Sequence, residues 1–226
     1  MQNAKRNMNE LIKAEQLGNG VVLYSGDFPL GTDAVQLAGF AAVPKGAAVC
    51  DLCAGSGAVG LLLLAREPSL SVTAVELREE ACALMERSVT ESGIENRFRI
   101  LRGDVRAIRD LLPAGSFRYA VCNPPYYPVG SGYVPEDEAR AVARTELRCT
   151  LADACAAAAW LLPTGGSLWM VHRPERLTDL LCTLRAHNLE PKLLKPVCAT
   201  SGAAPSLILV KATKGGKPGL VWQSTL

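Results

Sequence analysis

Residues 121 to 130 read VCNPPYYPVG, so an apolar run ends at an asparagine that two prolines and two tyrosines follow. Proline lacks a backbone N–H and restricts the residue before it to extended conformations. Pro124 and Pro125 therefore offer carbonyl acceptors in a stiff loop. The side-chain oxygen of Asn123 adds an acceptor, and Tyr126 adds an aromatic face. Such a loop is suited to grip a flat group that carries an NH2.

A second group of unusual residues, CDLCAGSGAVG, occupies positions 50 to 60. Gly55 and Gly57 remove side chains where a strand is expected to turn into a helix, so backbone N–H groups can approach a ligand closely. The run GSGAVG fits the dinucleotide pattern G-x-G-x-x-G, and Glu76 follows about 20 residues later. A dehydrogenase that binds NAD is therefore one alternative.

Three further features separate this pattern from a dinucleotide site. Asp51 stands before the glycines, Asp104 follows the third predicted strand, and the NPPY run ends the fourth. In a doubly wound sheet these points all lie along one crevice at the carboxyl ends of the strands. The sequence thus predicts one site that combines several acids with an amide and an aromatic ring.

The apolar pattern predicts the elements that position these residues. Four nearly continuous apolar strands alternate with helices, as expected for a parallel sheet covered on both faces. The strands are AAVCDL, SVTAVEL, FRILRG and RYAVCN, with helices at 58–66, about 78–92 and near 105–112. The second half adds a helix at 150–162, the strand SLWMVH, a helix at 175–187, and the strands LEPKLLKPVC and SLILVKAT. The short turn SGAAP favours an antiparallel pairing of these last two strands.

The predicted fold class is α/β, a Rossmann-like, doubly wound and mostly parallel seven-stranded sheet with an antiparallel last strand. Residues 1–45 are expected to form an N-terminal extension that packs on the domain formed by residues 46–226. Within the extension we expect a short amphipathic helix at 5–17, the strand VVLYS at 21–25 and a helix at 32–43 capped by Thr32.

Composition limits the protein class. The sequence has no run of about 18 uncharged apolar residues, and the polar start MQNAKRNMNE has no signal core. We therefore expect a cytoplasmic protein without a membrane partner, with its eight cysteines reduced. The CxxC of Cys50 and Cys53 has no second pair, and His172 and His187 are not in ligand spacing, so no metal site is predicted.

The net charge is only +2, but it is unevenly distributed. From Arg185 onward, six basic residues stand against the single acid Glu190. A polyanion could dock on this part of the chain, and a solvated basic tail is the alternative.

The acid-and-glycine pattern, the GDV at 103 to 105 and the NPPY run together resemble the class I S-adenosylmethionine-dependent methyltransferases over positions 47 to about 212. The resemblance implies that Asp51 faces the ammonium end of the cofactor, that Glu76 accepts from the ribose hydroxyls, and that Asp104 accepts from the adenine amine. Carboxylates suit a cofactor that carries ammonium and sulfonium charges. The implied cofactor set is Thr32, Asp51, Ala54, Gly55, Gly57, Glu76, Leu77, Asp104, Val105 and Asn123.

In family members with this loop, the target is a planar amino group whose nitrogen lone pair is delocalised. Acceptors at its two hydrogens help the nitrogen to pyramidalise, and the resemblance assigns them to the Asn123 side chain and the Pro124 carbonyl. Tyr126 is expected to stack on the target. The catalytic set is thus Asn123, Pro124, Pro125 and Tyr126, and a rigid proline turn without chemistry is the alternative.

Nearly the full length is similar to the bacterial tRNA(Val) adenine methyltransferases, through GDFPLGTDAVQLAGF, NPPYYPVGSG, the stretch ARTELRCTLADACAAAAWLLPTGG and HRPERL. That family modifies the 6-amino group of adenine 37, which implies RNA as partner and S-adenosylhomocysteine as product. The substrate contacts are expected at Tyr126, Tyr127, Arg173 and Lys195. The alternatives are an rRNA guanine, a release-factor glutamine, and a non-catalytic RNA-binding paralogue.

Overall fold

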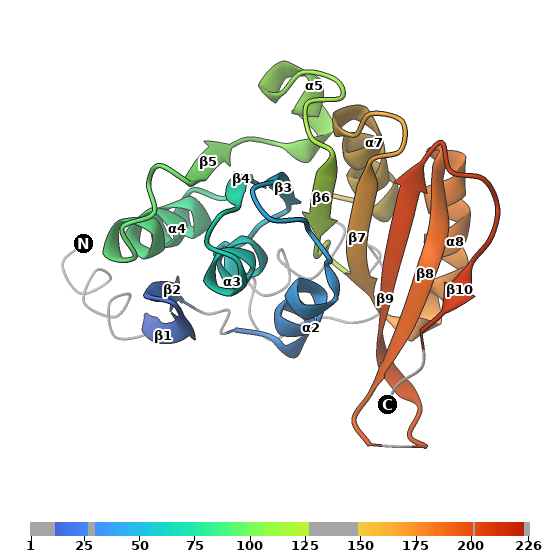
Figure 1. Cartoon of the computed structure of the whole chain (residues 1–226), viewed down its shortest axis with the longest axis horizontal. Helices are drawn as coiled ribbons and strands as arrows, with labels where there is room; N and C mark the ends of the chain where they lie inside the picture. Colours follow the sequence, from blue (N-terminus) through green and yellow to red (C-terminus); the bar gives the residue numbers. More distant parts are fainter. Residues whose placement is uncertain (1–11, 27–29, 127–148, 201, 224–226) are drawn as a thin grey trace.

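An eight-stranded sheet, in the order β10-β8-β9-β7-β6-β3-β4-β5, forms the centre of the fold (Figure 1). The computed structural model describes residues 12–26, 30–126, 149–200 and 202–223. The strands in chain order are β3 (Ala48–Leu52), β4 (Ser71–Glu76), β5 (Phe98–Arg102), β6 (Tyr119–Cys122), β7 (Ser167–His172), β8 (Leu189–Cys198), β9 (Pro205–Lys214) and β10 (Val221–Trp222).

The pairing of the strands confirms the predicted fold class. β3, β4, β5, β6 and β7 pair in parallel, whereas β9 runs antiparallel to both β7 and β8. The seven predicted strands all form, and β10 is an addition of two residues that pairs in parallel with β8. A two-residue strand is too short to produce a periodic pattern in the sequence.

Helices cover both faces of the sheet, as continuous apolar strands require. On one face lie α2 (Thr32–Phe40), α3 (Ala58–Arg66) and α4 (Glu79–Glu91). On the other lie α5 (Ile108–Leu111), α7 (Leu151–Leu161) and α8 (Leu177–Ala186), with the 3-10 turns η1 (Val105–Ala107) and η2 (Pro174–Arg176). In the described ranges, none of the helices has the length and apolarity that a bilayer crossing needs.

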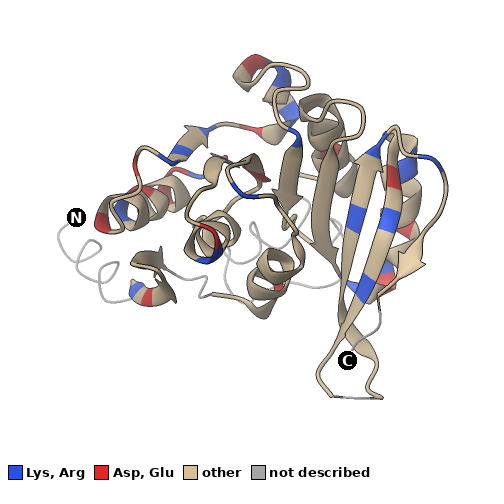
Figure 2. Ribbon diagram, in the orientation of Figure 1, with Lys and Arg blue, Asp and Glu red and all other residues tan. Residues whose placement is uncertain are grey.

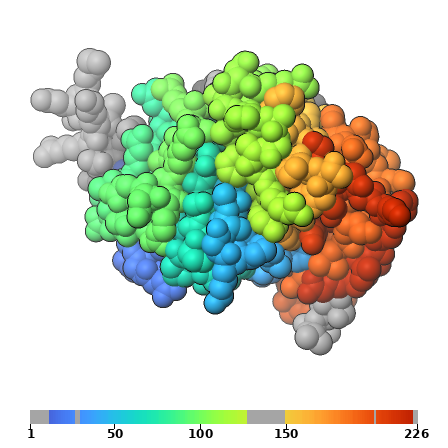
Figure 3. All heavy atoms as spheres, turned by 45° about the horizontal axis from the view of Figure 1, so that its top comes forward, coloured from blue at the N-terminus to red at the C-terminus, as the bar shows by residue number. Residues whose placement is uncertain are grey.

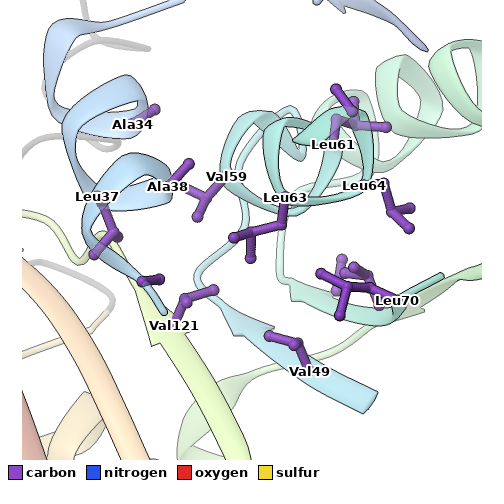
Figure 4. Close-up of a cluster of buried hydrophobic side chains, with 14 of the residues drawn as sticks. Ala34, Leu37, Ala38, Val49, Val59, Leu61, Leu63, Leu64, Leu70 and Val121 are labelled. Atoms are coloured by element: carbon purple, nitrogen blue, oxygen red, sulfur yellow. The ribbon is translucent and has the colours of Figure 1, made fainter. Parts of the chain in front are cut away.

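The core beneath α2 and α3 fixes these two helices against the strands that carry the site. Side chains from both helices converge on Val49 of β3 and Val121 of β6 (Figure 4). At the far ends of the helices, Arg66 of α3 donates to the carbonyl oxygens of Ala38 and Ala41, the latter at 2.6 Å. The carboxyl end of α2 is thereby joined to the carboxyl end of α3.

The strand order reverses direction between β3 and β6. From β3 the chain proceeds to β4 and β5 on one side, and β6 and β7 lie on the other. In doubly wound sheets this switch point opens a crevice at the carboxyl ends of the strands, where ligands bind. The loops that follow β3, β4, β5 and β6 all begin at this edge of the sheet.

The prediction of a helix at residues 5–17 is wrong for its described part. Lys13–Gly18 is a strand, β1, which pairs antiparallel with β2 (Val21–Ser25), whereas residues 5–11 lie outside the described ranges. Gly18 at the end of β1 and the connecting residues Asn19 and Gly20 all have positive φ, the backbone conformation that tight hairpin turns require. This turn chemistry prevailed over the weak helical periodicity.

The hairpin of β1 and β2 is held by α4 rather than by the central sheet. The hydroxyls of Ser88 and Ser92 accept hydrogen bonds from the backbone N–H groups of Tyr24 and Val22, at 2.8 and 2.9 Å. The hairpin and the strands β8 and β9 occupy opposite ends of the molecule (Figure 3).

Thr32 does not cap α2, so that prediction is also wrong. The N-cap is Gly31, and Thr32 is the first helical residue. The side chain of Asp33 accepts the Ala34 N–H at 2.8 Å, a bond that a capping side chain would otherwise make. The helix ends at Phe40 rather than at residue 43.

Candidate active site

A pocket of about 340 Å³ opens at the carboxyl ends of β3, β4, β5 and β6. Its size lies within the range of small-molecule sites. Residues from the start of α2 and from the loops after the four strands line it: Leu30, Gly31, Asp33, Ala34, Asp51, Cys53, Ala54, Gly55, Ser56, Ala58, Val59, Val75, Glu76, Leu77, Arg78, Gly103, Asp104, Val105, Asn123, Pro124, Pro125, Tyr126 and Cys149.

Asp51, in β3, is a buried carboxylate with one oxygen unused. Its side chain lies in the pocket wall with 1% of the residue exposed, and Oδ2 accepts the Gly60 N–H at 2.9 Å. Oδ1 has no partner among the described residues. Burial raises the pKa of Asp51 to about 7, while the Gly60 N–H acts in the opposite direction. A cationic ligand group would satisfy the unpartnered oxygen.

Glu76, the last residue of β4, ties the glycine loop to the sheet. Oε2 accepts the Gly55 N–H at 2.8 Å, and Oε1 accepts from the backbone and the Nε of Arg78 at 3.0 and 3.1 Å. A carboxylate offers about four acceptor positions, so capacity for a ligand hydroxyl remains.

Gly57 belongs to the same loop but does not line the pocket. It has a φ of 81° as the N-cap of α3, and a Cβ there would lie 2.8 Å from Cγ of Met85. The structure therefore explains this glycine by close packing of the loop on α4.

Asp104 follows β5 and is bound by a neighbour two residues away. Its Oδ1 accepts the Arg106 N–H at 2.9 Å, and Oδ2 pairs with Nη2 of Arg106 at 2.5 Å. The hydrogen bond from the Arg106 side chain lowers the pKa of Asp104. A ligand amine at Asp104 would therefore share the carboxylate with the guanidinium.

The NPPY residues form the opposite wall. The hydroxyl of Tyr126 lies 2.8 Å from Oδ2 of Asp33 and also contacts Oδ1 of Asn123. The Tyr126 ring meets His172 edge-on, with ring centres 5.4 Å apart. Burial lowers the pKa of His172 to about 4, so this imidazole is neutral at pH 7. The aromatic residue is thus held at both its hydroxyl and its ring.

Most of the predicted site residues meet in this pocket. Those that line it are Asp51, Ala54, Gly55, Glu76, Leu77, Asp104, Val105, Asn123, Pro124, Pro125 and Tyr126. Thr32, Gly57, Arg173 and Lys195 do not line it, and Tyr127 lies outside the described residues. The chemical roles of all these residues stay predictions.

Two predicted substrate residues, Arg173 and Lys195, lie outside the pocket lining. Arg173 follows β7 and donates to the Ser206 carbonyl at 3.3 Å. Lys195 lies on β8 opposite Leu209 of β9, and Lys192 and Lys211 belong to the same two strands. Figure 2 shows Lys and Arg residues, in blue, along β8 and β9.

Sequence reasoning missed Asp33 and Cys149. The only local signal for Asp33 was an acid in the first turn of a helix, which normally indicates a favourable helix end. Cys149 approaches Cys53 at the pocket, with the two sulfur atoms 3.6 Å apart. Within the described ranges, no group of three His, Cys, Asp or Glu residues could hold a metal ion.

The family comparison covers most of this architecture. The family model described as Methyltransferase small domain matches residues 34–183. This span includes every strand end that lines the pocket.

Relatives with assigned names share moderate identity. A tRNA1(Val) (adenine(37)-N6)-methyltransferase of Shewanella sp. (strain MR-4) is 33% identical over 117 residues, 51% of this chain and 48% of that protein. One of Aeromonas salmonicida (strain A449) is 30% identical over 187 residues, 82% of this chain and 77% of that protein. A ribosomal protein uL3 glutamine methyltransferase of Bordetella pertussis is 33% identical over 88 residues, which is 38% of this chain and 28% of that protein. The chain thus spans about half the length of the Shewanella relative.

Solved structures share the fold. An Agrobacterium tumefaciens protein described as a predicted O-methyltransferase has a TM-score of 0.69 at 22% identity, covering 85% of both chains. TrmN from Thermus thermophilus has a TM-score of 0.59 at 22% identity, covering 80% of this chain and 48% of that one.

Proposed function

The chain belongs to the methyltransferase small domain family, and from this we propose that it transfers a methyl group from S-adenosylmethionine to the 6-amino group of an adenine in RNA. The adenine we propose is position 37 of tRNA(Val), as in the names of the Shewanella and Aeromonas relatives. The observation that carries the proposal is one pocket that is lined by Asp51, with one unpartnered carboxylate oxygen, and by Asn123 and Pro124.

The acidic side of the pocket fits the proposed cofactor. The unpartnered oxygen of Asp51 suits an ammonium group, and Glu76 keeps acceptor capacity for a hydroxyl. Leu77 and Val105 supply apolar wall for a flat ring. When bound, S-adenosylmethionine supplies a methyl group on a sulfonium, which is already a strong electrophile.

The amide side acts on the target by orientation. An acceptor on each of the two N–H bonds would hold the amine and leave its lone pair directed along the line of transfer. Asn123 and Pro124 both line the pocket. No strong base is required, because the nitrogen can lose its proton after transfer.

Four basic residues at or near three neighbouring strands, called the basic surface below, suit an RNA backbone. This surface consists of Arg173, Lys192, Lys195 and Lys211, which follow β7 or lie on β8 and β9. We propose that these residues contact phosphates, and a tRNA substrate also agrees with the cytoplasmic location expected from the sequence. Because Leu30, Gly31 and Asp33 line the pocket, we also propose that residues 1–45 complete the catalytic unit.

The test is methyl transfer from labelled S-adenosylmethionine into separate tRNA, rRNA and protein fractions, followed by nucleoside and amino-acid analysis. We expect N6-methyladenosine in tRNA and in an anticodon stem-loop with adenine at position 37. A matched stem-loop whose purine lacks the amino group serves as the control. Absence of transfer to every fraction would contradict the proposed activity.

The match to a glutamine methyltransferase supports a second candidate. A glutamine side chain also presents a planar NH2, so the same acceptors would serve it. Methyl groups on protein glutamine, with none on RNA, would favour this candidate over the tRNA.

A further inference from the structure

Asp33 lies at the amino end of α2 and points one carboxylate oxygen at the NPPY residues. Its Oδ1 accepts the Ala34 N–H at 2.8 Å, and its Oδ2 lies 2.8 Å from the Tyr126 hydroxyl. Each oxygen of this carboxylate therefore contacts one donor, the backbone N–H of Ala34 or the hydroxyl of Tyr126.

The Tyr126 hydroxyl has two oxygen neighbours but only one hydrogen. Oδ2 of Asp33 and Oδ1 of Asn123 both contact it, and neither oxygen has a hydrogen of its own to donate. Burial, followed by the charge of Asp33, holds the pKa of Tyr126 well above its ordinary value, so the hydroxyl keeps its hydrogen. A charged acceptor forms the stronger bond, so the hydrogen belongs to Asp33.

The Asn123 amide can turn so that its oxygen and its NH2 group exchange places, because the two ends have the same shape. Which end faces a neighbour is decided by the hydrogen-bond network. With the Tyr126 hydrogen on Asp33, the NH2 end of Asn123 is the better partner for the Tyr126 oxygen. Among the described residues, the other end of this amide has no hydrogen-bond partner, so turning the amide changes only its contact with the Tyr126 hydroxyl.

We propose that Asp33 is a positioning residue which, through the Tyr126 hydroxyl, turns the Asn123 amide so that its carbonyl oxygen faces the target amine. This inference rests on the proposed function, because the amine is its substrate group. The order of donation runs from the Asn123 NH2 to the Tyr126 oxygen, and from the Tyr126 hydroxyl to Asp33. The side-chain oxygen of Asn123 is then left to accept a hydrogen bond from the target amine.

Gly31 supplies the space that this arrangement needs. A Cβ at Gly31 would overlap Oδ1 of Asp33, so only glycine lets the carboxylate fold back over the start of α2. A substitution at Gly31 therefore displaces Asp33 without changing any group of the relay.

The substitution Asp33→Asn tests the direction of the relay. The oxygen of the introduced amide should stay on the Ala34 N–H, so the NH2 of that amide donates to the Tyr126 oxygen. The Tyr126 hydrogen must then go to the Asn123 oxygen, and the NH2 of Asn123 faces the target amine. The NH2 of Asn123 and the NH2 of the target are both donors and cannot bond to each other. Asp33→Asn should therefore lower the transfer rate more than Asp33→Ala, in which the Asn123 amide can still turn.

The experiment is single-turnover methylation of the anticodon stem-loop, with S-adenosylmethionine affinity measured by calorimetry on the same samples. We expect Asp33→Asn to lower the transfer rate about 100-fold, and Asp33→Ala, Tyr126→Phe and Gly31→Ala about tenfold, with cofactor affinity little changed. The double variant Asp33→Asn with Tyr126→Phe should recover to the level of Tyr126→Phe alone, because the hydroxyl that enforces the wrong amide direction is gone. The matched controls are Asp110→Asn on α5 and Tyr119→Phe on β6, neither of which lines the pocket.

The outcomes separate the relay from the proposed function. If the wild type transfers no methyl group to any amino group, the proposed function fails. If the wild type is active but Asp33→Asn is no slower than Asp33→Ala, or the double variant shows no recovery, the relay is overturned. The side-chain amide 15N–1H resonances of Asn123 give a readout without substrate, and we expect them to shift in both Tyr126→Phe and Asp33→Asn but in neither control. Unchanged resonances would also overturn the relay.

Discussion

The two walls of the pocket are held in different ways. On the acidic wall, Glu76 and Asp104 each bind an arginine two residues further along the chain, and Asp51 binds the N–H of Gly60. On the amide wall, Tyr126 is held by Asp33, which lies 93 residues away in the sequence. The acidic wall is therefore held mainly by bonds of short sequence separation, the longest being the bond from the Gly55 N–H to Glu76, 21 residues apart. The amide wall instead contains a contact between Tyr126 and a distant residue of α2. This difference predicts that changes to the two walls affect different steps.

The largest effect is expected from Asn123→Ala on the amide wall. Removal of this acceptor should lower the rate of methyl transfer about 1000-fold, because the bond acts mainly in the transition state. S-adenosylmethionine affinity, measured by calorimetry, should change little. A parallel loss of cofactor affinity would contradict the separation of the two walls.

On the acidic wall, Glu76→Ala should weaken S-adenosylmethionine binding by about 1.5 to 3 kcal/mol, the range for charge-assisted hydrogen bonds. The exposed acid Glu80 of α4 offers a matched control as Glu80→Ala. Titration calorimetry measures both variants. Unchanged affinity in Glu76→Ala would remove the support for a ribose contact.

A smaller effect is expected from the protonation of Asp51, which should make S-adenosylmethionine affinity depend on pH. Because burial raises its pKa to about 7, the cofactor-free site holds a proton below that pH. An ammonium ligand needs the charged form, so affinity should rise up to about tenfold per pH unit from pH 6 towards 7 and then level off. Binding at pH 6 should release a proton, which calorimetry in buffers of different ionisation enthalpy detects. Equal enthalpies in all buffers would contradict this role.

The same group gives a prediction for the stability of the cofactor-free protein. The pKa of Asp51 is higher in the folded chain than the ordinary 3.8, so the folded state binds the proton more tightly. This contribution is present below about pH 4 and is lost as the pH rises to about 7. The free energy of unfolding should therefore fall less over this window in Asp51→Asn than in the wild type, as measured by urea titration.

The smallest effect is expected outside both walls, from triple replacement of Lys192, Lys195 and Lys211 by alanine. RNA affinity should fall about equally for all sequences, and the salt slope should decrease by about one for each phosphate that the protein no longer neutralises. Lys45→Ala, at a residue before the amino end of β3, is the control. An unchanged salt slope in the triple variant would exclude the basic surface from RNA binding.

The local character of the acidic wall explains why sequence reasoning located it. Buried parallel strands appear as continuous apolar runs, so the ends of β3, β4 and β5, and the acids there, were predicted. The role of Asp33 depends on where α2 docks, which no local pattern encodes. The sequence indicated only an aromatic face at Tyr126, whereas the contacts of its hydroxyl predict that Tyr126→Phe loses activity. The helix predicted over β1 failed for a related reason, since pairing with β2 decided its structure.

Arg66 has a consequence for how the pocket comes apart. The glycine loop leads into the amino end of α3, Asp33 stands at the amino end of α2, and Arg66 joins the carboxyl ends of both helices. The amino ends of α2 and α3 both face the pocket, and their carboxyl ends are connected through Arg66. Movement of either amino end away from the pocket therefore strains the same Arg66 contacts. On heating, α2 and α3 should therefore separate from the pocket in a single cooperative step. Binding of the cofactor and binding of the target amine should be lost at the same temperature.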